Sequence, residues 1–227
     1  MLSVPPESRD ITVAMITLNE EGAVEKVIRS IQDVVPDAEI LLVDSSTDAT
    51  PEIATSLGAR VIRQFPPAGY GPAMDLALRS ASGSVVVTLD CDDTYPTERI
   101  PELRDLVLEG GWDVVDGSRL SRKPNAMPFA NYVGNWLLGM LASLLFGKRL
   151  RDLHSGMRAY RKSVIDDLRF DPKGAALPVE LLLRPLKEGS RVLVVPIAYR
   201  YRIGESTMRP LETIRWSVRR ILRVRLT

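Results

Sequence analysis

Short apolar runs alternate with helical patterns along the first half of the chain, and this alternation constrains the fold more than any other feature. The spacing predicts strands over 11–18, 39–44, 59–64, 84–90 and 112–116, with helices after Asn19, after Thr50, over 72–82 and over 96–109. Strands that alternate with helices pair in parallel and carry helices on both faces of the sheet. The sequence therefore predicts an α/β fold with a mostly parallel sheet.

The second half of the chain has a weaker pattern. After about Ser118 the alternation gives way to expected helices and loops, apart from the apolar strand-like run VLVVPIAY at 192–199. The sequence contains no internal repeat and no stretch with the composition of a linker. We therefore expect residues 1–227 to form a single domain in which the second half completes a site.

The composition excludes some classes of protein. A net charge of +1 over 227 residues provides no overall field for nucleic acid, and 45% hydrophobic residues suffice for a large core. A single cysteine, Cys91, cannot form an internal disulfide and fits a reducing compartment. The first residues lack the basic start and apolar run of a signal peptide. The apolar stretch 136–146 is shorter than the roughly 20 residues of a membrane span, so none is expected.

Two stretches suit a membrane surface. Residues 132–146 combine Trp136 with many leucines, and residues 209–225 combine Trp216 with clustered arginines. A basic amphipathic helix with tryptophan can lie on an anionic membrane, where Arg219, Arg220 and Arg223 would face the lipid. The alternative is that the two stretches pack on each other or on a partner chain. The sequence leaves both readings open.

Three carboxylates, Asp90, Asp92 and Asp93, follow the apolar run Val85–Leu89. Ligands of open α/β sheets bind at the carboxyl ends of strands, where Asn19 and Asp44 are also expected. In an extended tip, Asp90 and Asp92 project to one side, and Mg²⁺ commonly takes one or two such carboxylates. A solvated loop in which Asp93 caps the next helix is the alternative, and the strand-end position favours the metal.

Seven motifs carry a resemblance to a known family. They are ITLNEE, LLVDSSTDAT, PPAGYGPAMDLALRSASG, TLDCDDTYP, VVDGSR, RDLHSGMRAYR and YRIGEST, and they run in this order from about Ile11 to Thr207. The chain resembles family 2 glycosyltransferases of the GT-A fold, and most of all the polyprenyl-phosphate sugar synthases such as dolichyl-phosphate mannose synthase. The resemblance implies a Rossmann-like, mostly parallel sheet flanked by helices, with a helical and looped half on the acceptor side.

The resemblance also implies an activity. Such an enzyme transfers a sugar, with inversion, from a GDP- or UDP-linked donor to a polyprenyl phosphate, with Mg²⁺ or Mn²⁺ as cofactor. About 11–118 would bind the nucleotide sugar, about 119–207 the acceptor, and 208–227 would be a basic amphipathic helix. The protein would lie in the cytoplasm, peripheral at the cytoplasmic face of the membrane. A second copy or a membrane subunit could be a further partner.

The resemblance assigns roles to individual residues. The nucleotide sugar would contact Thr17, Asn19, Glu20, Asp44, Asp90 and Asp92, with Asp44 on the base and Asp90 and Asp92 on the metal. The catalytic set would be Asp92, Arg119, Asp152 and Arg202, and the acceptor phosphate would meet Arg119, Ser155, Arg158, Arg202 and Ser206. Ser45 stands where relatives often have a second acid, which leaves the base and the sugar open.

Plainer roles remain for the same residues. Glu20 could serve only a helix dipole, Arg119 and Arg202 could be structural ion pairs, and Asp152 could order a nearby arginine. His154 fits a local hydrogen-bond partner better than a base. An ionised acceptor phosphate needs little help from a base, whereas a hydroxyl acceptor would want one, with Asp152 as the candidate.

Two rival functions stay open at this point. One is a soluble family 2 glycosyltransferase with a sugar, small phosphate or protein acceptor. The other is a non-catalytic subunit that keeps the fold.

Overall fold

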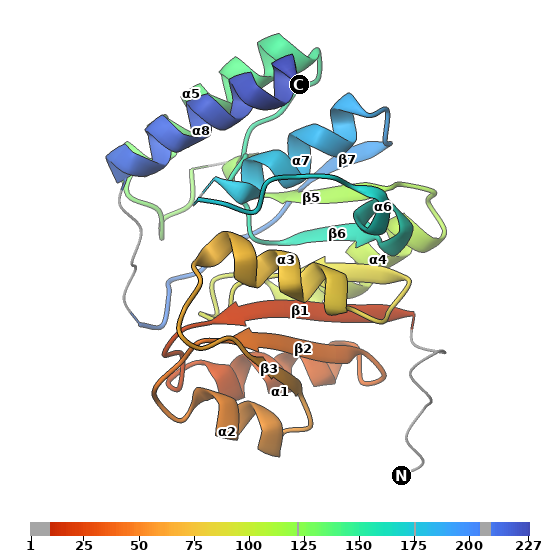
Figure 1. The fold of residues 1–227 in the computed structure, drawn as a ribbon, viewed down its shortest axis with the longest axis vertical. Coiled ribbons are helices and arrows are strands. Elements are labelled where there is room, and N and C mark those ends of the chain that lie inside the picture. Colours follow the sequence, from red (N-terminus) through yellow and green to blue (C-terminus); the bar gives the residue numbers. More distant parts are fainter. Residues whose placement is uncertain (1–9, 122, 175, 205–209) are drawn as a thin grey trace.

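The computed structural model describes residues 10–121, 123–174, 176–204 and 210–227 (Figure 1). The strands are β1 (Ile11–Thr17), β2 (Glu39–Asp44), β3 (Arg60–Arg63), β4 (Val85–Thr88), β5 (Val114–Ser118), β6 (Arg158–Arg161) and β7 (Val192–Pro196). The helices are α1 (Val24–Val34), α2 (Thr50–Ser56), α3 (Tyr70–Ser80), α4 (Ile100–Leu108), α5 (Phe129–Phe146), α6 (Lys162–Asp167), α7 (Leu177–Lys187) and α8 (Pro210–Leu226). Every strand expected from the sequence is present, with ends that differ by a few residues.

The described strands form one sheet in the order β3-β2-β1-β4-β6-β5-β7. The pairs β1–β2, β1–β4, β2–β3 and β5–β7 are parallel, and β6 runs antiparallel to both of its neighbours. The mostly parallel sheet predicted from the sequence is therefore confirmed.

The second half adds more sheet than the sequence indicates. Strand β6 inserts between β4 and β5, where Arg158 pairs in register with Thr88 on one side and Asp116 on the other. The pattern RAYR has no apolar run, so β6 was not predicted. It can be buried because the Arg158 guanidinium is neutralised by Asp116 inside the sheet.

Two separate apolar cores cover the two faces of the sheet. Helices α1, α2 and α4 cover one face, and α3, α6 and α7, with α5 and α8 beyond them, cover the other. Along β1, Val13 and Met15 enter the first core and Ala14 the second, as expected for a strand buried on both faces. Burial of each such large side chain contributes roughly 1.5–3 kcal/mol, which fixes the strand ends in place.

Helices α5 and α8 lie side by side at one end of the molecule (Figure 1). Helix α5 begins at Phe129, well before the apolar stretch read from the sequence. At 18 residues it is long and apolar enough, by length and composition, to cross a membrane. The expectation that no segment reaches this length was therefore wrong. The same helix packs against α7 and α8, and 17% of this span is buried.

Candidate active site

The carboxyl ends of β1, β2 and β4 open onto one cavity of about 570 Å³. Its wall combines residues that follow these strands with residues of α3, α7 and α8: Ile16–Glu20, Ser45, Pro67, Gly69, Tyr70, Ala73, Asp90, Cys91, His154, Gly156, Pro178, Arg202, Gly204, Glu212, Thr213 and Trp216. Thr17, Asn19, Glu20, Asp90 and Arg202, which the resemblance assigned to the site, thus line one cavity.

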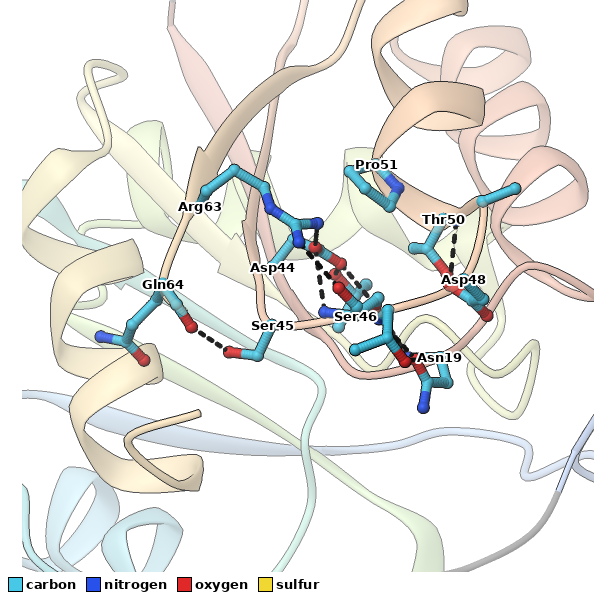
Figure 2. A network of polar contacts seen from close by, with 12 residues as sticks. Asn19, Asp44, Ser45, Ser46, Asp48, Thr50, Pro51, Arg63 and Gln64 are labelled. Carbon is cyan, nitrogen blue, oxygen red and sulfur yellow. Dashed lines mark hydrogen bonds and ion pairs between the residues drawn. The ribbon is translucent and has the colours of Figure 1, made fainter. Parts of the chain in front are cut away.

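Asp44 organises the end of β2 (Figure 2). Its carboxylate accepts hydrogen bonds from Thr17 Oγ1 at 2.7 Å and Ser46 Oγ at 2.6 Å, and it also pairs with the Arg63 guanidinium. The side chain is fully buried, and Ser45 rather than Asp44 lines the cavity. The expected contact of Asp44 with a base is not possible in this arrangement. Asp44 instead holds Thr17 in the wall.

A helix was expected directly after Asn19, but it begins further along the chain. Helix α1 begins only at Val24, and Asn19 has a left-handed backbone with φ of 59°. Asparagine tolerates this conformation because its side chain can bond locally. Its Oδ1 accepts the Thr47 amide at 2.9 Å, and its own amide donates to Ser46 Oγ at 2.7 Å. Asn19 therefore joins the ends of β1 and β2.

The turn after β4 separates its three carboxylates. Oδ1 of Asp92 accepts hydrogen bonds from the Thr94 amide at 3.1 Å and the Thr94 hydroxyl at 2.6 Å. Asp93 adopts a positive φ of 63° and pairs with Lys26 Nζ at 2.5 Å. The capping role considered for Asp93 is therefore wrong. Cys91 is buried between the two site aspartates, as predicted.

The carboxylates share a negative site. Burial, and then the nearby Asp92, raise the pKa of Asp90 above its usual range. Burial is also the main cause that raises the pKa of Glu20 to about 7, with Asp92 and Asp90 adding to it. Both pKa values are raised mainly by burial, and a divalent cation at this site would favour the ionised carboxylates.

The donor set fits a cation that is completed by other ligands. Asp90 packs against Gly156, where an added Cβ would lie 2.8 Å from Asp90 Oδ1, so only glycine leaves the carboxylate its place. Among the described residues no group of three His, Cys, Asp or Glu side chains has the geometry to hold a metal. Two aspartates with open positions for substrate oxygens is an arrangement typical of Mg²⁺.

Arg202 provides the positive charge that faces these carboxylates. Its Nη2 lies 3.1 Å from Asp92 Oδ2 and 3.6 Å from Glu20 Oε1. The next amide, of Ile203, donates to the Asp92 carbonyl at 3.0 Å, which ties this segment to the turn after β4. Ser206, expected in the same segment, lies outside the described residues.

Comparison with known proteins decides the family. Residues 12–169 match the family model for glycosyl transferase family 2. The chain belongs to glycosyl transferase family 2. A dolichyl-phosphate hexose transferase of Haloferax volcanii is 44% identical over 202 residues, which cover 88% of this chain and 87% of the relative. An undecaprenyl-phosphate mannosyltransferase of Micrococcus luteus is 28% identical, covering 85% and 84%.

Solved structures confirm the GT-A fold. Glucosyl-3-phosphoglycerate synthase of Mycobacterium tuberculosis, solved with Mn²⁺, UDP-glucose and phosphoglyceric acid, aligns with a TM-score of 0.78 and 25% identity. That alignment covers 96% of this chain and 80% of the solved one. This chain is therefore a GT-A glycosyltransferase.

Arg119 of the glycosyltransferase lies at the end of β5, beside a second cavity of about 320 Å³ lined also by Ser121, Lys123 and Tyr199. The Asp152 carboxylate accepts hydrogen bonds from Arg119 Nε at 2.7 Å, from Arg119 Nη2 at 2.9 Å and from the Arg119 backbone amide at 3.0 Å. Arg119 and its hydrogen bonds lower the pKa of Asp152 despite its burial. Asp152 is therefore a poor base, and it orders Arg119 rather than Arg151 or Arg158.

Two expected acceptor contacts are not possible in this arrangement. The Arg158 guanidinium is buried and donates to Asp116 Oδ1 at 2.5 Å, to Leu153 O at 3.0 Å and to the Pro178 carbonyl. Ser155 is also buried, and its hydroxyl donates to the Gly117 carbonyl at 2.5 Å. Both residues instead hold the loop before β6 against the sheet.

The helical wall of the cavity was not predicted. Helix α8 contributes Glu212, Thr213 and Trp216 to it, and the loop after Asp152 contributes His154. Ser217 Oγ donates to the Thr213 carbonyl at 2.7 Å, so it must accept from His154 Nε2, also at 2.7 Å. This fixes the proton on Nε2, and burial lowers the pKa of His154 to about 4. Within the described residues, buried Nδ1 has no hydrogen-bond partner.

Arg220 also departs from the prediction that it faces lipid. It is buried and pairs with Glu180 of α7, while Nη1 donates to the Asp171 carbonyl at 2.8 Å. Arg223 pairs with the Asp171 carboxylate at 2.6 Å. Alternating arginines and apolar residues look the same in a sequence whether the arginines face lipid or buried acids. The Arg220–Glu180 pair holds α8 on α7 and so places Trp216 in the cavity.

Proposed function

We propose that this enzyme transfers a hexose from a nucleotide diphosphate sugar to a polyprenyl phosphate at a membrane surface. The names of the Haloferax volcanii and Micrococcus luteus relatives, a dolichyl-phosphate hexose transferase and an undecaprenyl-phosphate mannosyltransferase, support the lipid acceptor. The observation that carries the proposal is the position of α8. This helix lines the carboxylate cavity through Trp216 and exposes other apolar side chains beside α5.

The donor would bind in the strand-end cavity. Asp90 and Asp92 would hold Mg²⁺ or Mn²⁺, ions found with UDP in structures of the mycobacterial synthase. A bound cation would stabilise the charge that develops on the leaving diphosphate. The Arg202 guanidinium would bind the same diphosphate through two nitrogens, a geometry that lysine lacks. Thr17, Asn19 and Ser45 would line the pocket beside the nucleotide.

The acceptor phosphate would approach from the side of Arg119 and Lys123. An oxygen of the ionised phosphate attacks the anomeric carbon, the bond from that carbon to the diphosphate oxygen breaks, and its electron pair leaves with the diphosphate. No proton has to be removed from such an acceptor, which agrees with the lack of a suitable base in Asp152. Asp152 would keep the Arg119 guanidinium aligned for the incoming phosphate.

The membrane contact would come from α5 and α8. The most exposed large apolar side chains of these helices are Phe129 (68%), Leu144 (82%) and Leu226 (83%). Arg215, Arg219 and Arg225 are also exposed on α8 and could meet anionic lipid, where each contributes roughly 1 kcal/mol. We propose peripheral docking. Location at the cytoplasmic face and a second subunit stay predictions.

Product analysis tests the proposed function. Purified protein would be incubated with Mn²⁺, a polyprenyl phosphate in vesicles and a panel of labelled UDP- and GDP-sugars, followed by thin-layer chromatography. We expect one labelled lipid product with one or few donors. Vesicle binding should rise with anionic lipid and weaken when Arg215, Arg219 and Arg225 become glutamine. Absence of any lipid product, with intact donor binding, would exclude this acceptor.

A small phosphate is the second candidate acceptor. It is favoured by the mycobacterial synthase, which was solved with phosphoglyceric acid and aligns over almost the whole chain. The same assay with phosphoglycerate and without vesicles separates the candidates. A water-soluble product formed efficiently in this arm would replace the lipid proposal.

A further inference from the structure

The two oxygens of Asp92 are not equivalent toward a cation. Oδ1 already accepts two hydrogen bonds from Thr94, which together occupy its in-plane lone pairs. Oδ2 is therefore the oxygen left for a metal. Arg202 Nη2 forms an ion pair with this same Oδ2, at 3.1 Å.

A divalent cation and a guanidinium at 3.1 Å from one oxygen repel each other and compete for the same lone pairs. We propose that Arg202 competes with the divalent cation for Oδ2 of Asp92, and that a bound diphosphate admits the cation by drawing Arg202 away. The inference deepens the proposed function and rests on it only in taking a nucleotide diphosphate as the ligand.

Glu20 gives the guanidinium a second position. Its Oε1 lies 3.6 Å from Arg202 Nη2, so the side chain can leave Asp92 without losing all of its negative partners. The backbone of this segment stays tied through the bond from the Ile203 amide to the Asp92 carbonyl, at 3.0 Å. The exchange then needs only a side-chain movement toward a diphosphate in the cavity. Arg202 is 32% exposed and has room for it.

Two consequences follow for binding. Without a nucleotide, the protein should bind Mn²⁺ weakly, because the cation must displace Arg202. With a diphosphate present, cation and nucleotide should strengthen each other, because the phosphate oxygens accept Arg202 and also complete the metal coordination. Arg202 would thus oppose the metal in one state and cooperate with it in the other.

The test measures Mn²⁺ binding to the purified full chain by the electron paramagnetic resonance signal of unbound Mn²⁺. Without nucleotide, Arg202→Gln should bind Mn²⁺ about tenfold more tightly than wild type. A charge within about 4–6 Å changes the proton affinity of a carboxylate by about 10- to 1000-fold, and we expect the low end of that range for the cation. With saturating UDP the order should reverse, and Arg202→Gln should bind Mn²⁺ more weakly than wild type. Arg202→Lys, which keeps the charge, should lie between them without nucleotide.

Arg200→Gln is the matched control. It removes the same charge two residues away, from a side chain that pairs with Glu98 outside the cavity, at 2.7 Å. Its Mn²⁺ affinity should stay within about twofold of wild type, since an exposed pair contributes little. Thermal unfolding of each variant shows that the comparison is made on folded protein.

Three results would overturn the inference. The first is an Arg202→Gln variant that binds Mn²⁺ no more tightly than wild type without nucleotide. The second is an equal gain in Arg200→Gln, which would mean a general charge effect. The third is a gain in Mn²⁺ affinity that survives in the double variant Asp92→Asn/Arg202→Gln, which would mean that the ion does not bind at Asp92. A failure of lipid transfer leaves all of these readouts intact, so the two proposals fail separately.

Discussion

The two sides of the cavity are built in different ways. One side consists of the ends of strands, where Thr17 ends β1 and Glu20 and Asp90 lie in the turns after β1 and β4. The other side consists of α7, α8 and the loop before β6, where Pro178, His154 and Trp216 arrive from distant parts of the chain. Polar groups on the first side are held by hydrogen bonds between the ends of neighbouring strands. Polar groups on the second side depend on buried ion pairs between helices. The groups that carry the chemistry and the contacts that hold the architecture therefore lie on different sides of the cavity.

The largest effect should come from the strand-end side. We expect Asp92→Asn to lower turnover by at least about 100- to 1000-fold, the usual effect of removing one group that stabilises developing charge. The fold should persist, because the amide keeps the side-chain volume and can still accept from Thr94. The measurement is the initial rate at saturating Mn²⁺, with circular dichroism to confirm folding.

Asp93→Asn is the control for this change. Asp93 is the next residue, but it pairs with Lys26, whereas Asp92 pairs with Arg202 of the cavity wall. Its turnover should stay close to wild type. Equal losses in the two variants would show that the turn, and not a specific carboxylate, is what matters.

The helical side should respond in stability rather than chemistry. Arg220→Gln leaves the buried Glu180 with Arg184 alone, at 2.7 Å, and two carbonyls without their donor. Breaking a buried pair typically costs about 3–5 kcal/mol, and we expect the low end because Arg184 remains. Chemical denaturation measures the loss. Arg223→Gln, whose side chain is 51% exposed, should cost no more than about 1 kcal/mol. Equal losses would mean that burial does not distinguish these pairs.

The strand-end side could be predicted from sequence because its signals are local. A run such as Val85–Leu89 identifies a buried strand, and a charge directly after it must lie at the edge of the sheet. The resemblance added Thr17 and Arg202, whereas Asp44, also at a strand end, is buried and does not line the cavity. Whether an acid at a strand end faces the cavity or its neighbours depends on Thr17, Ser46 and Arg63, which come from three segments.

The helical side could not be predicted because its contacts join residues that are far apart in the sequence. Arg158 was assigned to the acceptor phosphate by the resemblance, but Asp116 in the neighbouring strand neutralises it. Arg220 was read as a lipid contact because Glu180 lies 40 residues earlier in the chain. Partners at such separations leave no periodic pattern. The signal that remained visible was Trp216 among arginines, and it suggested an interface but not a cavity.

Trp216 connects the two sides, and its removal should have an intermediate effect. We expect Trp216→Ala to lower kcat/KM by about tenfold, the equivalent of about 1.4 kcal/mol of lost contact with substrate. The assay uses the preferred nucleotide sugar and a short, water-soluble acceptor. Trp136→Ala is the matched control, because this tryptophan lies on α5 and does not line the cavity. It should alter vesicle binding only. The reverse pattern would place the substrate on α5.

The smallest effect should come from His154, and it tests whether the helical side is as tightly closed as its hydrogen bonds indicate. His154 is the only histidine in the chain, so its imidazole gives a single set of NMR signals. Those signals should report a neutral ring with the proton on Nε2, bonded to Ser217, and a pKa of about 4. The unfolded chain takes up this proton near pH 6.5, whereas the folded chain does not.

The sign of the pH effect follows from that difference. Because the unfolded state binds more protons between pH 6.5 and about 4, stability is fully present above pH 6.5 and falls as the pH is lowered through this window. Between pH 7.5 and 5.5 the loss from His154 should be roughly 1 kcal/mol. It should disappear in His154→Gln, and it should shrink in Ser217→Ala, where water can reach the ring. An imidazole that titrates near pH 6.5 in the folded protein would show that this side of the cavity is open to solvent, and the contrast between the two sides would then be lost.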